Sequence, residues 1–118
     1  LGVTHDDTEQ DCRYLADKVV NLRIFTDAED KMNRELLDEQ GEALIISQFT
    51  LYGDSRKGRR PSFTDAALPD RAIPLYEQFI REVSDLGVKV ATGRFGANMQ
   101  LEIHNDGPVT LMVESRKS

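Results

Sequence analysis

Cysteine and long apolar runs are what this sequence most lacks. Its 118 residues include a single cysteine, Cys12. That count excludes an internal disulfide framework and a cysteine-rich zinc site, and it favours a reducing compartment. No apolar run approaches the roughly 20 residues that a membrane-spanning helix needs, and no basic segment with an apolar core follows Leu1, so no signal peptide is predicted. We therefore expect a cytoplasmic protein without a membrane segment.

The motifs of several enzyme classes are missing as well. The sequence contains only two histidines, His5 and His104, and neither a His-Glu-x-x-His nor a Cys-x-x-Cys motif, so no catalytic metal held by side chains is expected. The Gly-x-Ser-x-Gly motif of hydrolases is absent. The glycines of segment 93–96 and Gly58 do not have the spacing of a dinucleotide fingerprint or a P-loop.

Positive charge is scarce overall but concentrated in one place. The net charge is −6, from 21 acidic and 15 basic residues, which disfavours non-specific binding to polyanions. Four cations nevertheless occupy five consecutive positions: Arg56, Lys57, Arg59 and Arg60. Such a patch on an acidic body suggests local contact with a phosphate, and the alternative is an ordinary solvated loop.

Length and composition predict one small globular domain, residues 1–118. Hydrophobic residues make up 39% of the chain and charged residues 31%, as in folded rather than disordered proteins. A domain of this size buries only about two thirds of its unfolded surface. For this reason we expect a homo-oligomer.

Hydrophobic periodicity predicts two helices and several strands. Residues 8–21 and 69–86 have apolar stripes at helical spacing. The stripes consist of Cys12, Leu15, Ala16 and Val19 in the first helix, and of Ile73, Tyr76, Phe79, Ile80 and Val83 in the second. Strands are expected at 22–25, 43–52, 88–91, 99–104 and 108–113, with 43–46 buried on both faces and a polar excursion at 26–41. The predicted class is α+β, with an antiparallel-rich sheet or a small open barrel and helices on one side.

Two polar segments stand where they need either partners or a function. Ser47, Gln48 and Thr50 end the strand expected to be buried, where polar atoms are costly without hydrogen bonds. Asn105–Thr110 forms the last predicted turn and contains Gly107 and Pro108. Taken alone, the first segment could merely satisfy backbone groups at a strand end, and the second could be a plain turn.

Five blocks taken together resemble the D-aminoacyl-tRNA deacylase family, which removes D-amino acids from tRNA. The resemblance covers nearly the whole chain, and the blocks occur in the family's order. The blocks are Lys18–Phe25, Ser47–Asp54, Lys57–Phe63, Gly93–Met99 and Asn105–Thr110. Family members begin with an N-terminal β-hairpin ahead of the segment matching Leu1, and this hairpin is absent from the sequence.

The resemblance implies a homodimer with its active sites at the subunit interface. It places Ser47, Gln48, Phe49 and Thr50 in the family's catalytic motif, and Gly107 and Pro108 in a Gly-cisPro motif that reaches into the partner's site. It assigns Phe95 and Met99 to the pocket for the terminal adenosine. It implies no metal and no organic cofactor.

The activity that the resemblance implies is hydrolysis of the ester joining a D-amino acid to the 3′ end of tRNA. Arg56, Lys57, Arg59 and Arg60 would then contact tRNA phosphates. Without a histidine or lysine in the motif, we expect the substrate's 2′-hydroxyl to assist the attacking water, rather than Ser47 or Thr50 to act as nucleophile. Backbone carbonyls of Gly107 and Pro108 would exclude L side chains, and glycyl-tRNA would pass. The alternatives are a non-catalytic RNA-binding module and an esterase of small acylated nucleotides.

Overall fold

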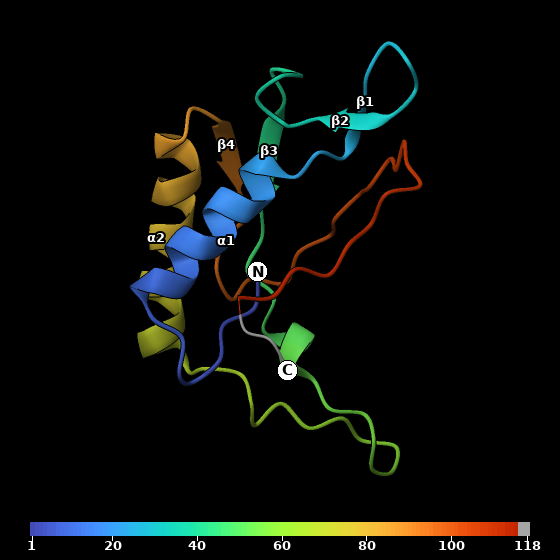
Figure 1. Cartoon of the computed structure of the whole chain (residues 1–118). Coiled ribbons are helices and arrows are strands. Elements are labelled where there is room, and N and C mark those ends of the chain that lie inside the picture. The colour runs from blue at the N-terminus through green and yellow to red at the C-terminus, as the bar shows by residue number, and fades with distance from the viewer. Residues whose placement is uncertain (116–118) are drawn as a thin grey trace.

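Two helices lie side by side on one flank of the molecule (Figure 1). The computed structural model describes residues 1–115. Helix α1 comprises Glu9–Asn21 and α2 comprises Pro69–Asp85, close to the predicted 8–21 and 69–86. The α+β class is thereby confirmed. Within residues 1–115, neither helix combines the length and the apolar character needed to cross a bilayer.

Helix α1 begins where its sequence favours a helix start. The backbone N–H of the N-cap Thr8 donates to Oδ2 of Asp11 at 2.8 Å, and acidic residues in the first turn complement the helix dipole. Cys12, Ala16 and Val20 are buried. These positions recur at i, i+4 and i+8, so one face of α1 packs against the core.

Helix α2 carries much of the core. Pro69 stands at its start, where the missing N–H costs nothing. The buried residues of α2 are Ala72, Leu75, Tyr76, Phe79 and Val83. Compared with the predicted stripe, Ile73 and Ile80 are only half-buried, because the helix turns its Ala72–Leu75 edge toward α1 and the strands.

The strands form two separate pairs. Strands β1 (Phe25–Thr26) and β2 (Met32–Arg34) pair antiparallel, whereas β3 (Glu42–Ile45) and β4 (Lys89–Thr92) pair parallel. The connection from β3 to β4 passes through α2, as a parallel pair requires. The antiparallel-rich sheet was therefore wrong for the described residues, and the open barrel stays a prediction.

Strand β3 is shorter and more open than its sequence suggested. It ends at Ile45, and the chain then forms a 3₁₀ helix, η1, over Phe49–Tyr52. Leu44 is 58% exposed, so the prediction that both faces are covered was wrong for this single chain. The continuous apolar run indicates burial on both sides, and no described element covers the second side of Leu44.

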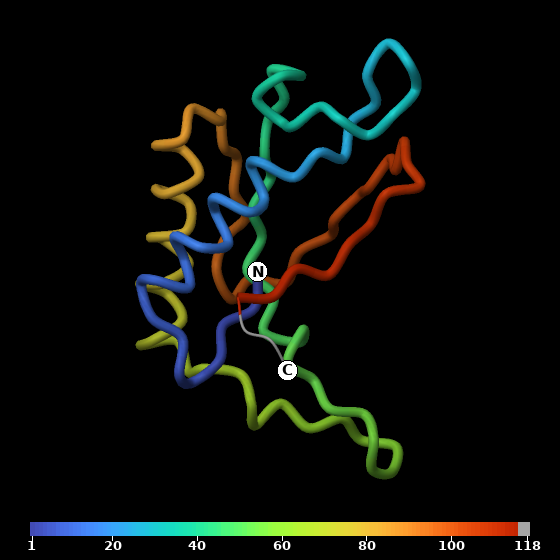
Figure 2. Tube along the Cα trace, in the orientation of Figure 1, coloured from blue at the N-terminus to red at the C-terminus, as the bar shows by residue number. Residues whose placement is uncertain are grey.

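Residues 97–115 form an extended arm rather than a strand pair. The arm, orange to red in Figure 2, leaves the body and returns, but no residue in 97–115 has strand structure. Leu101, Ile103 and Met112 are more than half exposed. The strands predicted at 99–104 and 108–113 were thus wrong, because alternation of apolar and polar residues yields a strand only when a neighbour completes the hydrogen bonds.

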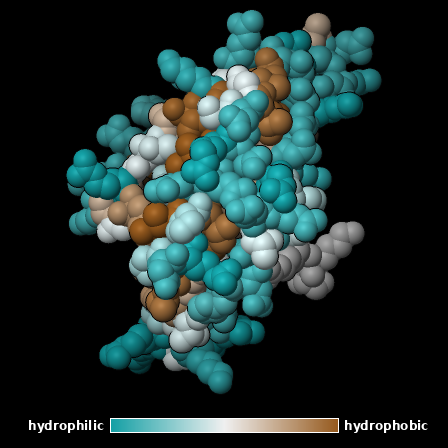
Figure 3. Space-filling model, turned by 90° about the vertical axis from the view of Figure 1, so that its left-hand side faces the viewer, coloured by the Kyte–Doolittle hydropathy of each residue, from teal (hydrophilic) through white to brown (hydrophobic). Residues whose placement is uncertain are grey.

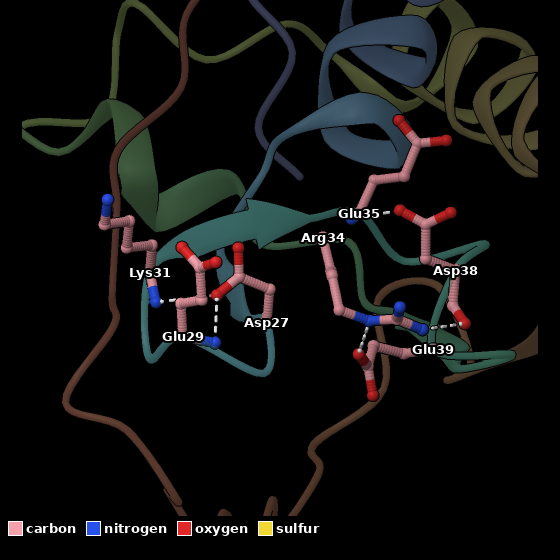
Figure 4. A network of polar contacts seen from close by, with 7 residues as sticks. All are labelled: Asp27, Glu29, Lys31, Arg34, Glu35, Asp38 and Glu39. Atoms are coloured by element: carbon pink, nitrogen blue, oxygen red, sulfur yellow. Dashed lines mark hydrogen bonds and ion pairs between the residues drawn. The ribbon is translucent and has the colours of Figure 1, made fainter.

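The polar excursion is an ordered unit. Asp27 accepts hydrogen bonds from the Asn33 side chain and from the backbone N–H groups of Glu29 and Lys31, and these bonds lower the pKa of its carboxyl. Figure 4 shows the two backbone bonds, to Glu29 and Lys31. Arg34 pairs with Glu39. Leu36 packs against the core, whereas Leu37 is 38% exposed.

Hydrophobic side chains also reach the surface on the helical flank. Figure 3 views this side and shows hydrophobic patches between hydrophilic ones. Leu68 and Leu86, which flank α2, are among the exposed hydrophobic residues. A second apolar region is a hollow of about 510 Å³ that includes Leu15, Leu44 and Leu111 in its lining. No predicted site residue lines this hollow.

Candidate active site

A cleft of about 480 Å³ lies where β3 and β4 end. It brings together two residues that the sequence analysis assigned to different parts of the site, Gln48 and Met99. The complete lining consists of Ile46, Gln48, Thr92, Gly93, Arg94, Met99, Gln100 and Leu101. Of these eight residues, only Arg94 carries a charge at neutral pH.

The parallel pairing of β3 and β4 creates this cleft. Parallel strands end at the same edge of a sheet, and the chain leaving each strand lines the crevice there. Gly93 directly follows β4 and lies against the side chains of Met99 and Ile46. A Cβ atom on it would lie 2.7 Å from Met99 Sδ and 2.8 Å from Ile46 Cδ1. The absence of a side chain at Gly93 therefore lets Met99 fold back against Ile46.

The Ser47–Thr50 segment forms the turn from β3 into η1. The Gln48 side-chain amide donates to Thr50 Oγ1 at 2.6 Å, and the Gln48 backbone N–H donates to the Leu1 carbonyl at 2.8 Å. The Phe49 ring packs edge-on against Phe63, with centroids 5.4 Å apart. The N–H groups of Phe49 and Thr50 open η1, where a helix has no preceding carbonyl to bind them.

Phe95 and Met99 do not share one environment. Phe95 packs against Tyr76, with ring centroids 5.9 Å apart, and contacts the core. The Tyr76 hydroxyl in turn donates to the Ile45 carbonyl at 3.0 Å, which ties α2 to the end of β3. Phe95 thus lies behind the cleft, while Met99 lines it.

Gly107 and Pro108 lie apart from the Ser47–Thr50 turn in this chain. They occupy the exposed end of the arm, and the peptide bond between them is cis. Neither residue lines the cleft. Within a single chain, the two halves of the predicted site are therefore not assembled.

The basic run forms a closed loop. Its base is an antiparallel bridge in which Asp54 N–H donates to the Ser62 carbonyl at 2.7 Å and Ser62 N–H to the Asp54 carbonyl at 2.9 Å. The Asp54 carboxylate also accepts two bonds from the Arg56 guanidinium, at 2.9 and 2.8 Å. These bonds lower the pKa of the Asp54 carboxyl to about 2.

The four cations of this loop are therefore not equivalent. Arg56 is neutralised by Asp54, whereas Lys57, Arg59 and Arg60 are exposed and form no ion pair with any of residues 1–115. Gly58, between them, has a φ of +64°, a left-handed conformation that favours glycine. The loop thus presents three unpaired positive charges to solvent.

Neither histidine forms a hydrogen bond with the Ser47–Thr50 turn. His5 Nε2 donates to the Thr64 carbonyl at 2.7 Å, and His104 is exposed on the arm. Neither histidine lines the cleft.

Sequence reasoning missed Arg94 and Thr92 as lining residues. The Gly93–Gly96 segment was rejected as a dinucleotide fingerprint and was included in the Gly93–Met99 block of the resemblance, but Arg94 was given no role. A usable signal was its position directly after a predicted strand, at 88–91. That signal becomes informative only once the strand is known to run parallel to β3, which the sequence did not show.

Comparison with known proteins identifies a family whose members this chain resembles. A family model described as D-Tyr-tRNA(Tyr) deacylase matches residues 1–114. A protein of Fervidobacterium nodosum named D-aminoacyl-tRNA deacylase is 63% identical over 117 residues, which span 99% of this chain and 78% of that protein.

One further relative and one solved structure carry names that differ from that of an active deacylase. A Bacillus subtilis protein named inactive D-aminoacyl-tRNA deacylase is 58% identical over 116 residues, which span 98% of this chain and 88% of that protein. A solved structure titled c-Myc DNA Unwinding Element Binding Protein is similar with a TM-score of 0.84 and 36% identity, over 92% of this chain and 74% of that one.

Proposed function

Since this chain belongs to the D-Tyr-tRNA(Tyr) deacylase family of hydrolases, we propose that it cleaves the ester of D-aminoacyl-tRNA. The products are the free D-amino acid and tRNA. The observation that supports the proposal is the cleft at the ends of β3 and β4, whose lining includes both Gln48 and Met99. We further propose that it acts in the cytoplasm, where tRNA is charged and used.

The terminal adenosine and its ester occupy the cleft in this proposal. Met99 supplies an apolar wall for the base, and the Gln48 amide is held by Thr50 at the entrance to η1. Phe95 supports this wall from behind through Tyr76. The site thus orients its substrate chiefly through shape and neutral hydrogen-bonding groups.

Cleavage of the ester relies on backbone groups and on the substrate itself. The N–H groups of Phe49 and Thr50 stabilise the oxyanion that forms when water attacks the carbonyl, and such a donor contributes about 3 kcal/mol in known hydrolases. The ribose 2′-hydroxyl assists the attacking water. The Thr50 hydroxyl accepts a bond from Gln48, and among the described residues 1–115 no base is hydrogen-bonded to it to remove its proton, which argues against a Thr50 nucleophile.

Selection for D-amino acids requires a second copy of the chain. In the proposal, the arm of one protomer delivers Gly107 and Pro108 to the site of its partner, forming the homodimer. Their carbonyls accept the substrate ammonium and leave no space for an L side chain. Glycine has no side chain to exclude, so glycyl-tRNA is also a substrate. The exposure of the arm's end supports this arrangement.

Phosphates of the acceptor end contact the basic loop. Lys57, Arg59 and Arg60 are free to pair with them, and Arg56 contributes less while Asp54 holds it. This refines the expectation that all four cations contact tRNA phosphates.

The deciding experiment compares D-Tyr-tRNA with L-Tyr-tRNA and follows loss of the ester. Selective hydrolysis of the D form is expected. Equal hydrolysis of both would instead indicate a general esterase. No hydrolysis, with tRNA still bound, would support a non-catalytic nucleic-acid-binding module, which the names of the Bacillus subtilis relative and of the similar structure make the second candidate.

The role of the 2′-hydroxyl has its own test. D-Tyr-tRNA ending in 2′-deoxyadenosine, charged on its remaining 3′-hydroxyl, is expected to be bound but hydrolysed far more slowly. Hydrolysis of this substrate at the normal rate would contradict substrate assistance.

A further inference from the structure

The cleft contains one charge that the proposed reaction does not yet use. Arg94 lines it together with Gln48 and Met99, and the other seven lining residues are neutral. Its side chain is exposed to solvent and forms no ion pair with any of residues 1–115. The guanidinium is therefore available to a ligand.

The backbone holds Arg94 firmly at this position. The N–H of the preceding Gly93 donates to the Ile45 carbonyl at 3.3 Å, and the Arg94 carbonyl accepts from Ala97 N–H at 3.2 Å. Gly96 completes the turn with a φ of +73°. This turn fixes the backbone position of Arg94. The turn belongs to the segment after β4 that also lines the cleft.

From this geometry we propose that Arg94 binds the phosphate that links the terminal adenosine to the preceding nucleotide. The inference rests on the proposed function, because it assumes an aminoacyl-adenosine in the cleft. Base, ribose and ester are all uncharged, and that phosphate is the nearest anionic group of the substrate. A guanidinium pairs with a phosphate through two parallel hydrogen bonds, which fixes orientation as well as position.

The same charge also determines which way the substrate lies. The α-ammonium of the amino acid is positive, so Arg94 repels it. The aminoacyl group therefore points away from Arg94, toward the Ser47–Thr50 turn, while the phosphate lies at the Arg94 end. Arg94 thereby acts as a binding residue that sets the direction of the substrate.

The test uses two small substrates that differ only in this phosphate: 3′-D-tyrosyl-adenosine with a 5′-phosphate and the same ester with a free 5′-hydroxyl. The unaltered protein is expected to have a kcat/KM about tenfold higher for the phosphorylated ester, in line with one charged hydrogen-bonded pair. Arg94→Ala is expected to lose this preference, so that the ratio of the two kcat/KM values falls to about one. Arg94→Lys, which keeps the charge but not the paired bonds, is expected to be intermediate.

Arg81→Ala is the matched control, since it removes the same charge from an exposed position on α2 outside the cleft. It is expected to leave both rates unchanged. Equal losses on both esters in Arg94→Ala, or no loss on either, would overturn the proposal.

A binding measurement separates this inference from the proposed activity. Titration with adenosine 5′-monophosphate and with adenosine, followed by NMR, requires no turnover. Tighter binding of the monophosphate to the unaltered protein, lost in Arg94→Ala, would support the phosphate site even if neither ester were hydrolysed. Identical affinities for adenosine 5′-monophosphate and adenosine would refute it even if D-Tyr-tRNA were cleaved.

Discussion

Thr50 is the residue at which the two mechanisms for this site differ most. Its hydroxyl accepts a bond from the Gln48 amide, and within residues 1–115 it forms no hydrogen bond with a histidine or lysine. We predict that Thr50→Ala keeps the single-turnover rate on D-Tyr-tRNA within about tenfold, because the loss of a true nucleophile typically costs several orders of magnitude. Thr26→Ala, an exposed threonine on β1, is the control. A drop of a thousandfold or more with binding retained would make Thr50 the nucleophile.

Cys12 illustrates a second effect at the residue scale, that of burial on a thiol. Its Sγ lies 3.3 Å from the Leu75 carbonyl, and burial, followed by the nearby acidic side chains, raises the pKa of the thiol to about 11. The reactive thiolate at pH 8 is then about 100-fold scarcer than for an unshifted thiol. We predict slow modification by a disulfide reagent in the folded protein and rapid modification in denaturant, measured spectroscopically. Rapid reaction before unfolding would contradict this.

At the scale of elements, the basic loop behaves as one unit whose cations are not equivalent. We predict that Lys57→Ala and Arg59→Ala each reduce the slope of log Kd for tRNA against log salt by roughly one. Arg56→Ala is expected to change it less, because Asp54 already pairs with Arg56. Titrations monitored by fluorescence anisotropy at several salt concentrations measure these slopes. The control is Arg13→Ala on α1. An unchanged slope in Lys57→Ala would indicate that the loop is an ordinary solvated loop.

At the scale of the whole molecule, the exposed apolar arm argues for assembly. Ile103 is 73% and Met112 75% exposed, an unfavourable arrangement for an isolated chain. We predict a dimer by sedimentation velocity, and we predict that Ile103→Asp both shifts it toward monomer and lowers deacylation, since a buried unpaired charge is costly. Tyr14→Asp, at an exposed position of α1, should leave both unchanged. A dimeric and fully active Ile103→Asp would refute a role for the arm in assembly.

Local signals predicted the elements that depend on nearby residues. The cap at Thr8, the proline at Pro69 and the apolar stripes located both helices to within a residue or two. The stripe of α2 was slightly misjudged, because periodicity does not reveal that Leu75 rather than Ile73 faces α1. The strands at 99–104 and 108–113 were wrong for a related reason. Alternation describes a surface, but strand structure also needs a hydrogen-bonding neighbour.

The sequence by itself determined the family, the residues of the Ser47–Thr50 motif and the existence of a basic loop, because these depend on residue identity and on contacts within a few positions. Only the tertiary structure decided that β3 and β4 run parallel and that their ends bring Gln48, Met99 and Arg94 to one cleft. It also decided that Asp54 forms an ion pair with Arg56. Those relations depend on which distant segments meet. Pairing of distant segments is set by the packing of the whole core, and no local pattern encodes it.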